Sequence, residues 1–513
     1  MKSSKDRDDN TRKRLRGDQL GKVLASLVLL LSLAATFAAT TVPQVTASAE
    51  FVLTRLHLFT IQASSQRNSD ANLEAVRRQD RLARNARGII TRLTPEEHLR
   101  RASVYHANRA FDEAREHWQA LINYYPDDPR VAEALLGIGR SYYQARQYTE
   151  AYNAYDQLAR VYPSTKEGRE GLNFSAASLL RMGRASDAAD RYLEYINRFP
   201  DGERIETAHL NAIDTLREAG RLQEASNWIG RTRQRFAGTP TETNAIFAQL
   251  RLEISEGNWR RAISSADELS RRGFQKGVSI TPAEVAYLKA YSLDRAGNRD
   301  AAFEAYLSVP TGIDSYYGWL ANDRLAAIAD TKLRSQADER VNGNNSQVAG
   351  VADRYPAPYR QAIIATAKKR KLDPRFVLAL IRQESVFRPL AKSPAGARGL
   401  LQLTMDAAQK YASNAGVSNL QESQLYQPET SIRLGGEYLA ELFGMFPNMP
   451  EAVAASYNGG EDNVARWVRR AKQKDPGVFT SEVGFDETKA YVQKVMNNYR
   501  VYRQLYTADL LRK

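Results

Sequence analysis

Glu384 stands out because it places an ionisable carboxylate on an apolar helix face. The pair Asp373-Pro374 is a typical helix start, with an N-cap followed by proline at the first helical position. Val377 and Ile381 precede Glu384 by seven and three residues, which is one face of a helix. A carboxylate on an apolar wall has a raised pKa, the property of a general acid that works near neutral pH. The alternative is a structural glutamate that pairs with a distant arginine or caps a turn.

Two glycine-rich turns supply further groups that could bind a ligand. The first, SPAGARGLLQ at 393–402, permits close approach of backbone and is followed by a helix that opens near Thr404. The second, ASYNGG at 455–460, places the ring of Tyr457 beside the amide of Asn458. Rings and amides suit a sugar site, because ring faces contact pyranoses and amides bind hydroxyls and acetamides. Each turn alone is typical of a plain connection between helices, and only the combination is specific.

A repeat array precedes these motifs. An alanine that follows a charged residue recurs every 37 residues, and a sixth copy, Asp300-Ala301, follows 39 residues later. The five regular copies are Ala114, Ala151, Ala188, Ala225 and Ala262. Prolines and glycines recur in phase, so we expect one helical hairpin per period and an α-solenoid over about 95–310, similar to the tetratricopeptide family. Its concave surface is either a binding groove for a polymer or protein, or part of a spacer.

Composition excludes several classes of protein. With 513 residues, of which 43% are hydrophobic and 26% charged, the chain is neither disordered nor a multi-span membrane protein. The absence of cysteine excludes disulfides, thiolate metal sites and a cysteine nucleophile. The five histidines show no HExxH spacing, so we expect no metal and no other cofactor. The net charge of +14 favours an acidic partner, such as nucleic acid, anionic lipid or a cell-wall polymer.

The N-terminus predicts export. Residues 1–22 carry eight basic and four acidic side chains, residues 23–49 carry no charge, and Ala47-Ser48-Ala49 supplies a cleavage site. We interpret residues 1–49 as a removed signal peptide, with a retained single membrane anchor through residues 23–39 as the alternative. Both place the body outside the cytoplasm, and the basic residues form no compact platform with aromatic rings, so we expect no nucleic-acid partner.

The remaining chain divides into four predicted parts, all of them helical except a linker. Residues 50–94 are a helical segment, and 95–334 are the tetratricopeptide-like α-solenoid with its connector, SYYGWLANDRL. The Asn-rich and Gly-rich stretch 335–351 is predicted to be an exposed linker. Residues 352–513 lack β-alternation and are predicted to be a mostly helical catalytic domain, so the fold class is all-α.

The segments RQES, SPAGARGLLQL, ASYNGG and ETKAYV resemble the lysozyme-like catalytic domain of the soluble lytic transglycosylases of bacterial peptidoglycan. This resemblance implies non-hydrolytic cleavage of the β-1,4 bond between N-acetylmuramic acid and N-acetylglucosamine, which leaves a 1,6-anhydromuramoyl end. It assigns Glu384 as the catalytic acid and then base. It assigns to substrate binding the residues Ser393, Leu401, Gln402, Tyr457, Asn458, Glu487 and Tyr491.

The resemblance also implies a place and partners. It implies a periplasmic protein that acts on peptidoglycan strands, with other cell-wall enzymes as candidate partners of the array and a peripheral or single-anchor membrane association as an alternative. Leu401 stands where the family usually has methionine, so we expect an altered substrate contact and retained chemistry. Two other functions stay open: a hydrolytic muramidase on the same fold, with Glu487, Asp462 or Asp406 as second carboxylate, and an exported scaffold that binds peptidoglycan or wall enzymes without catalysis.

Overall fold

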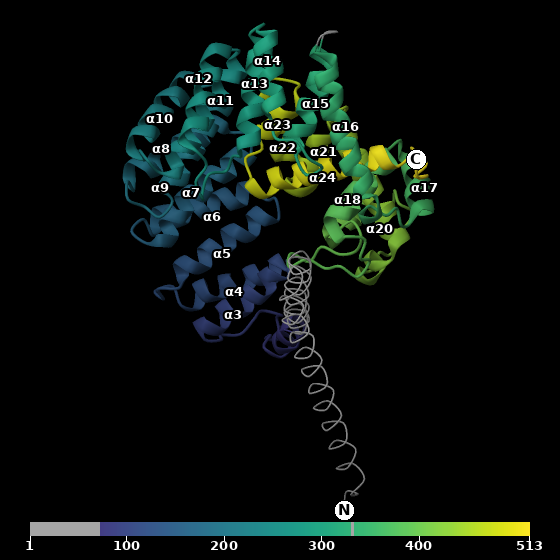
Figure 1. The fold of residues 1–513 in the computed structure, drawn as a ribbon. Coiled ribbons are helices and arrows are strands. Elements are labelled where there is room, and N and C mark those ends of the chain that lie inside the picture. Colours follow the sequence, from purple (N-terminus) through teal and green to yellow (C-terminus); the bar gives the residue numbers. More distant parts are fainter. Residues whose placement is uncertain (1–71, 330–332) are drawn as a thin grey trace, which may run out of the picture. The chain divides into compact units, whose positions relative to one another are not determined.

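The computed structural model describes residues 72–329 and 333–513, which are mainly helical (Figure 1). Among these residues β-pairing is limited to four isolated bridges, so the predicted all-α class is confirmed. Residues 83–513 form one compact unit. None of the helices in the described ranges combines the length and the apolar character that a membrane span needs. The predicted signal peptide, 1–49, lies outside the described residues.

The helical segment predicted over 50–94 needs correction in its last part. Residues 72–82 are helical, whereas 83–94 form a loop that is closed by a bridge between Arg84 and Ile90. Asn85 stabilises this loop, because its side-chain oxygen accepts hydrogen bonds from the backbone N–H groups of Arg87 and Ile89 at 2.9 and 3.1 Å. An asparagine that bonds to nearby backbone favours a turn over a helix.

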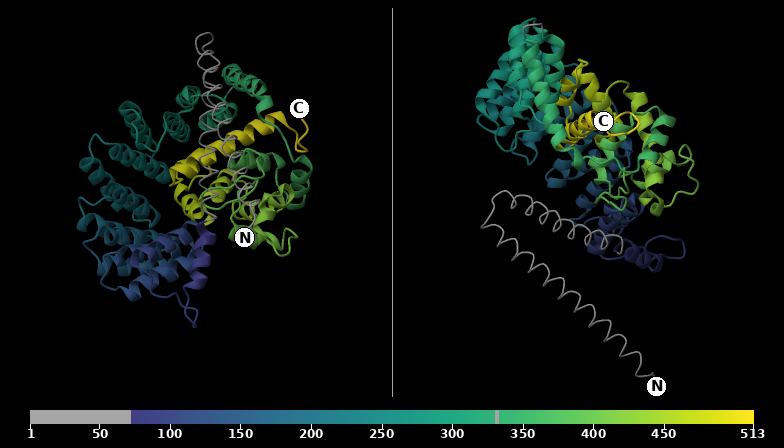
Figure 2. Two further views of the ribbon diagram at one scale, coloured as in Figure 1. Left: turned by 90° about the horizontal axis from the view of Figure 1, so that it is seen from below. Right: turned by 45° about the vertical axis from the view of Figure 1, so that its right-hand side comes forward.

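Residues 95–308 form six consecutive helical hairpins, as the repeat predicted. The hairpins are α3 (Pro95–Ala107) with α4 (Phe111–Tyr124), α5 (Val131–Gln144) with α6 (Tyr148–Val161), α7 (Lys166–Arg181) with α8 (Ala185–Arg198), α9 (Ile205–Glu218) with α10 (Leu222–Arg235), α11 (Pro240–Glu256) with α12 (Trp259–Arg272), and α13 (Pro282–Arg295) with α14 (Arg299–Ser308). Each helix packs on the next, so the hairpins follow one another along a curve (Figure 2, left).

The recurring alanine is fully buried in the first five hairpins. All five regular copies are 0% exposed. In the sixth hairpin the fully buried residue is Ala302, 40 residues after Ala262, and not the expected Ala301, which is partly exposed. The turn at 273–281, between α12 and α13, is long enough to hold the three added residues.

The turn inside each hairpin contains one residue with positive φ. That residue is Arg109, Arg146, Gly183, Gly220, Gly257 and Gly297 in the six hairpins in turn, with φ between 60° and 81°. Glycine adopts this conformation freely, whereas another residue loses about 1 kcal/mol there. The first two hairpins therefore carry a strained arginine where the other four carry glycine.

We expect Gly183→Ala to lower the free energy of unfolding by about 1 kcal/mol. The added Cβ would meet no atom within 4 Å, so the loss comes from the backbone conformation at φ 77°. Gly230→Ala is the matched control, because Gly230 lies inside α10 with open space around it and no positive φ. This variant should gain about 0.5–1 kcal/mol. Urea unfolding of both variants checks the prediction, and a shift of the same sign in the two would contradict it.

The segment predicted to be a linker, 335–351, is corrected by the structure, because it forms the helix α16 (Arg334–Gly350). Ala337, Asn344 and Val348 are buried and lie on one face of this helix, which packs on α15 (Tyr316–Ile328) and α24 (Asp486–Leu505). Asn344 also accepts a hydrogen bond from the hydroxyl of Thr311 at 2.6 Å. Because most residues of this helix are polar, the sequence pattern did not predict its buried face.

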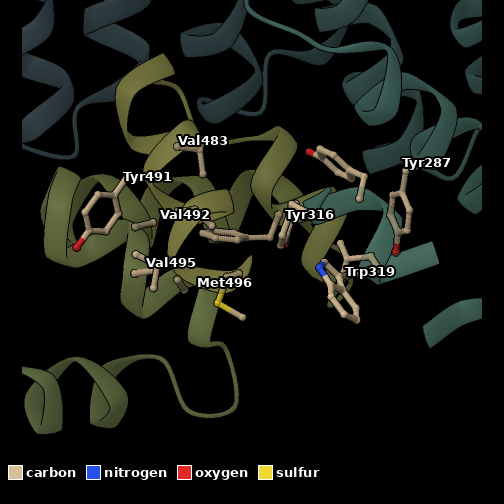
Figure 3. Packing of buried hydrophobic residues seen from close by; sticks show 14 of the residues in the cluster. Tyr287, Tyr316, Trp319, Val483, Tyr491, Val492, Val495 and Met496 are labelled. Carbon is tan, nitrogen blue, oxygen red and sulfur yellow. The ribbon is translucent and has the colours of Figure 1, made fainter. Parts of the chain in front are cut away.

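The C-terminal region is a set of short helices around α24. They are η1 (Ala352–Arg354), α17 (Arg360–Arg370), α18 (Pro374–Ser385), α19 (Met405–Ala412), η2 (Glu422–Tyr426), α20 (Pro428–Met445), α21 (Pro450–Gly459), α22 (Glu461–Ala471) and α23 (Pro476–Ser481). Buried apolar side chains continue from Tyr287 of the last hairpin through Tyr316 to Val492 of α24 (Figure 3). The end of the array and the C-terminal region therefore share one hydrophobic core.

A buried cluster of charged side chains also joins the array to the C-terminal region. Glu482, whose side chain is 1% exposed, pairs with Arg217 of α9 at 2.5 Å, with Arg251 of α11 at 3.2 Å and with Arg470 of α22 at 3.1 Å. Asp214 pairs with Arg217 and Arg251, each at 3.1 Å. Burial opposes the ionisation of Glu482, but the three guanidinium groups outweigh it and lower its pKa to about 2.

Candidate active site

Helix α18 holds Glu384 one residue before its end. Asp373 caps the start of the helix as predicted, since its carboxylate accepts a backbone hydrogen bond at 2.9 Å. Ile381, on the apolar face, is 0% exposed. After the helix, Val386 and Phe387 both have positive φ, 50° and 60°, which is a strained conformation for non-glycine residues. The helix therefore ends, and the chain changes direction, within three residues after Glu384.

The carboxyl of Glu384 has an environment suited to proton transfer. Burial raises its pKa to about 7, although a hydrogen bond that the hydroxyl of Tyr491 donates to Oε1 lowers it. Arg382 does not neutralise this charge, because it donates to the carbonyl of Arg354 at 2.6 Å and lies over the ring of Tyr355. A tyrosine and not an arginine is thus the hydrogen-bond partner of Glu384, which disfavours a purely structural role.

Tyr457 forms an aromatic wall near Glu384. Its hydroxyl donates a hydrogen bond to the carbonyl of Leu401 at 2.7 Å, and its ring lies 5.1 Å from that of Tyr438. Burial and the nearby negative charge of Glu384 raise the pKa of Tyr457 well above its usual value. The ring of Tyr438 stacks in turn on that of Tyr411. These two tyrosines were missed in the sequence, where nothing separates them from core tyrosines.

The turn at 393–402 is held in shape by its own polar groups. Ser393 accepts a hydrogen bond at 3.1 Å from the backbone N–H four residues later. The amide of Gln402 donates to the carbonyls of Ala391 and Gly399 at 3.0 and 2.9 Å. Gly399 has a φ of 79°, and a Cβ there would lie 1.9 Å from a carbonyl oxygen, so this position requires glycine. Ser393 and Gln402 remain partly accessible and lie on one rigid turn.

The structure places the other predicted residues less uniformly. The side chain of Leu401 is 0% exposed and packs against Gly435, so its expected contact with substrate is corrected. The close approach that Gly435 permits draws Leu401 into the core, and its carbonyl instead positions Tyr457. The second predicted turn, 455–460, is corrected, because α21 continues to Gly459 and Asn458 lies in its last turn. Asn458 is exposed and accepts a hydrogen bond from Thr488 of α24 at 2.5 Å. Glu487 is exposed in the first turn of α24.

The three candidates for a second carboxylate do not join Glu384. Asp406 pairs with Arg109 of the array at 2.9 Å. Asp462 lies in the first turn of α22, and Glu487 is exposed in that of α24. Within the part of the chain that the structure describes, none of the three is hydrogen-bonded to Glu384, whose partner is Tyr491.

Residues 361–479 match the family model of the transglycosylase SLT domain. This region is an SLT domain. Residues 99–171 match a tetratricopeptide repeat. The resemblance that the sequence segments carried is therefore confirmed for both parts of the chain. The SLT domain supplies Glu384, the turn at 393–402 and Tyr457 of α21, while Tyr491 follows the matched range in α24.

Several relatives of known name resemble the SLT domain. The soluble lytic murein transglycosylase of Escherichia coli K12 is 32% identical over 161 residues, which are 31% of this chain and 24% of the relative. That of Salmonella typhimurium is 30% identical over 153 residues, 29% of this chain and 24% of the relative. The chain thus matches about a quarter of the length of these soluble relatives. The membrane-bound lytic murein transglycosylase C of Cronobacter sakazakii is 27% identical over 209 residues, 35% of this chain and 58% of the relative.

Two solved structures were also found to be similar to this chain. The lytic transglycosylase Slt of Pseudomonas aeruginosa aligns with 80% of this chain and 81% of its own, at a TM-score of 0.47 and 18% identity. The 70 kDa soluble lytic transglycosylase of Escherichia coli aligns with 80% of this chain and 88% of its own, at a TM-score of 0.36 and 15% identity.

Proposed function

We propose that this protein is a lytic transglycosylase that cleaves the β-1,4 bond between N-acetylmuramic acid and N-acetylglucosamine in peptidoglycan and leaves 1,6-anhydromuramoyl ends. The observation that carries the proposal is the single carboxyl of Glu384, with a pKa of about 7 and a tyrosine as its partner. The SLT domain match supports the substrate class. A periplasmic location and a role of the array in binding other wall enzymes belong to the same proposal.

One carboxyl performs both proton transfers in this mechanism. Protonated Glu384 donates its proton to the glycosidic oxygen as the bond from that oxygen to C1 of the muramoyl sugar breaks. The ionised carboxylate then accepts the proton of the C6 hydroxyl of the same sugar as this oxygen bonds to C1. Glu384 is thereby protonated again, and no water is consumed. A pKa near 7 suits both steps, because the acid and base forms are both accessible at neutral pH.

The neighbours of Glu384 have distinct tasks. Tyr491 holds Oε1 and stabilises the ionised form between the two proton transfers, which leaves Oε2 for the substrate. The ring of Tyr457 and the amide of Asn458 provide a wall for the sugars and a polar contact for them. Ser393 and Gln402 keep the turn at 393–402 in one conformation through the hydrogen bonds described above. The walls of the site are thus fixed before substrate binds.

Product analysis in H₂¹⁸O tests the proposal. The chain from residue 50 onward is incubated with purified peptidoglycan sacculi, and the soluble muropeptides are identified by mass spectrometry. Anhydromuropeptides without ¹⁸O are expected. Reducing muropeptides that carry ¹⁸O would replace the proposal with the muramidase, and sacculus binding without soluble products would replace it with the scaffold.

Tyr491→Phe is expected to shift the alkaline limb of the pH profile of kcat/KM upward by about 0.5–1 unit. In the unchanged protein, the hydrogen bond from Tyr491 lowers the pKa of Glu384. When the substitution removes this bond, the pKa of Glu384 rises, and its acid form persists to higher pH. Tyr499→Phe is the matched control on the same helix, because Tyr499 donates to the carboxylate of Asp373, outside the site, at 2.8 Å. An unchanged limb in the Tyr491 variant would contradict the assigned role.

A further inference from the structure

Two ion pairs link the first two hairpins of the array to the SLT domain. Arg109 of the α3–α4 turn contacts Asp406 at 2.9 Å across 297 positions of sequence. Arg146 of the α5–α6 turn contacts Glu461 at 2.7 Å across 315 positions. These arginines are the two residues that occupy the positive-φ position of their hairpins.

Both acidic partners lie within four residues of a residue of the proposed site. Asp406 lies in the first turn of α19, four residues after Gln402. Glu461 is the first residue of α22, three residues after Asn458. A Cβ at Gly460 would lie 3.7 Å from Nη2 of Arg146, so this arginine also lies against the residue that links α21 to α22.

The backbone at the two arginines gives an independent reason to assign them a task. The equivalent positions of the next four hairpins are glycines with φ of 74° to 81°, which adopt this conformation without strain. An arginine at φ 60° or 61° has a local conformational cost that glycine lacks. Strain of this kind persists where the side chain makes contacts that offset it, and here each side chain reaches the SLT domain.

We infer that Arg109 and Arg146 are positioning residues for glycan cleavage: by holding Asp406 and Glu461, the array fixes the turn at 393–402 and the C-terminal end of α21 in the arrangement that Glu384 requires. This inference rests on the proposed function. It makes the first two hairpins a working part of the site, in contrast to a spacer that only carries it.

The test is the double variant Arg109→Gly/Arg146→Gly in the chain from residue 50 onward. Glycine suits the positive φ, so the melting temperature should stay the same or rise. The kcat on sacculi should fall about tenfold with a smaller change in KM, because a looser turn at 393–402 and a looser end of α21 misplace substrate around Glu384. Arg184→Ala is the control, since Arg184 lies in the turn of the third hairpin and pairs within the array, with Asp187 at 2.6 Å. This control should keep the rate of the unchanged protein.

Exchange of the charges distinguishes positioning from direct substrate binding. Arg109→Asp/Asp406→Arg keeps an ion pair at this place, and aspartate tolerates positive φ. Relative to Arg109→Gly alone, the exchange should recover most of the rate. In addition, the difference in cleavage rate between the unchanged protein and the double glycine variant should become smaller at about 0.5 M salt, because salt screens exposed ion pairs.

The outcomes separate this inference from the proposed function. If the unchanged protein releases anhydromuropeptides and the double glycine variant does so at the same rate, the inference is overturned and the proposed function stands. If the variant is slow and the exchanged pair is not rescued, the arginines act in some other way and the inference is equally overturned. If the unchanged protein releases no anhydromuropeptides, the proposed function itself fails.

Discussion

Glu384→Gln is expected to lower the rate of anhydromuropeptide release from sacculi by about three orders of magnitude. Glutamine keeps the size of the side chain but has no proton to donate to the glycosidic oxygen and cannot accept one from the C6 hydroxyl. Binding of sacculi should persist, because the walls of the site do not depend on this proton. Quantitative mass spectrometry of the soluble products, together with a pull-down of the variant by sacculi, measures both effects.

Glu451→Gln is the matched control for this variant. Burial raises the pKa of Glu451 to about 7, as it does for Glu384. Glu451 lies in the first turn of α21, however, at the opposite end of that helix from Asn458. The control should release products at the rate of the unchanged protein. A similar loss in both variants would mean that buried carboxyls matter for the fold and that Glu384 has no special chemical role.

The same two variants should differ from the parent in the pH dependence of stability. Both glutamates have a folded pKa above the ordinary 4.5, so the contribution of each to stability is greatest below that pH and is lost as pH rises through about 7. Glutamine does not ionise, so each variant avoids this loss. Its free energy of unfolding should exceed that of the unchanged protein by about 2 kcal/mol at pH 8 and should differ little from it near pH 4. The gain should be smaller at Glu384, whose side chain remains partly accessible. Urea unfolding at the two pH values checks it.

Glu482→Gln is expected to cost about 3–5 kcal/mol in the free energy of unfolding. The substitution removes one of the two acids that neutralise Arg217, Arg251 and Arg470, and it leaves these three buried guanidinium groups with the single negative charge of Asp214. Because these pairs join the array to the SLT domain, the interface between them should also become more susceptible to proteolysis. Urea unfolding and limited proteolysis at pH 7 measure the two effects.

A surface pair within the array provides the comparison for Glu482. Glu203 pairs with Arg169 at 2.5 Å and has a side chain 46% exposed, so Glu203→Gln should cost at most about 1 kcal/mol. The effect at Glu482 should also depend on pH. Its pKa is lowered to about 2, so its contribution is complete above about 4.5 and disappears as pH falls toward 2. Equal losses at positions 203 and 482 would contradict the account of the buried cluster.

Local patterns predicted much of this structure, and the failures share a physical cause. The cap at Asp373 and the apolar spacing placed Glu384 correctly, and the period of the array gave its hairpins. The hydrogen bond from Tyr491 to Glu384 spans 107 positions, so no local pattern contains it. The buried face of α16 depends likewise on α15 and α24, which lie outside the segment predicted to be a linker.

Leu401 and the two arginines show the same limit. Leu401 is drawn into the core by Gly435, a partner 34 positions away that the family resemblance did not reveal. The repeat is visible in the alanines and glycines of the array, and the first two turns carry arginine at the positions where the others carry glycine. The task of these arginines becomes visible only when the turns are seen beside α19 and α22.

The hydrophobic core that runs from the last hairpin into α24 has a consequence for the order of assembly (Figure 3). Synthesis delivers the array first, and its surface around Tyr287 and Tyr316 stays uncovered until residues 475–505 follow. The finished hairpins are then a template on which the end of the chain completes its folding. A nascent chain that ends before α24 leaves this apolar surface of the array exposed to solvent, where it favours aggregation.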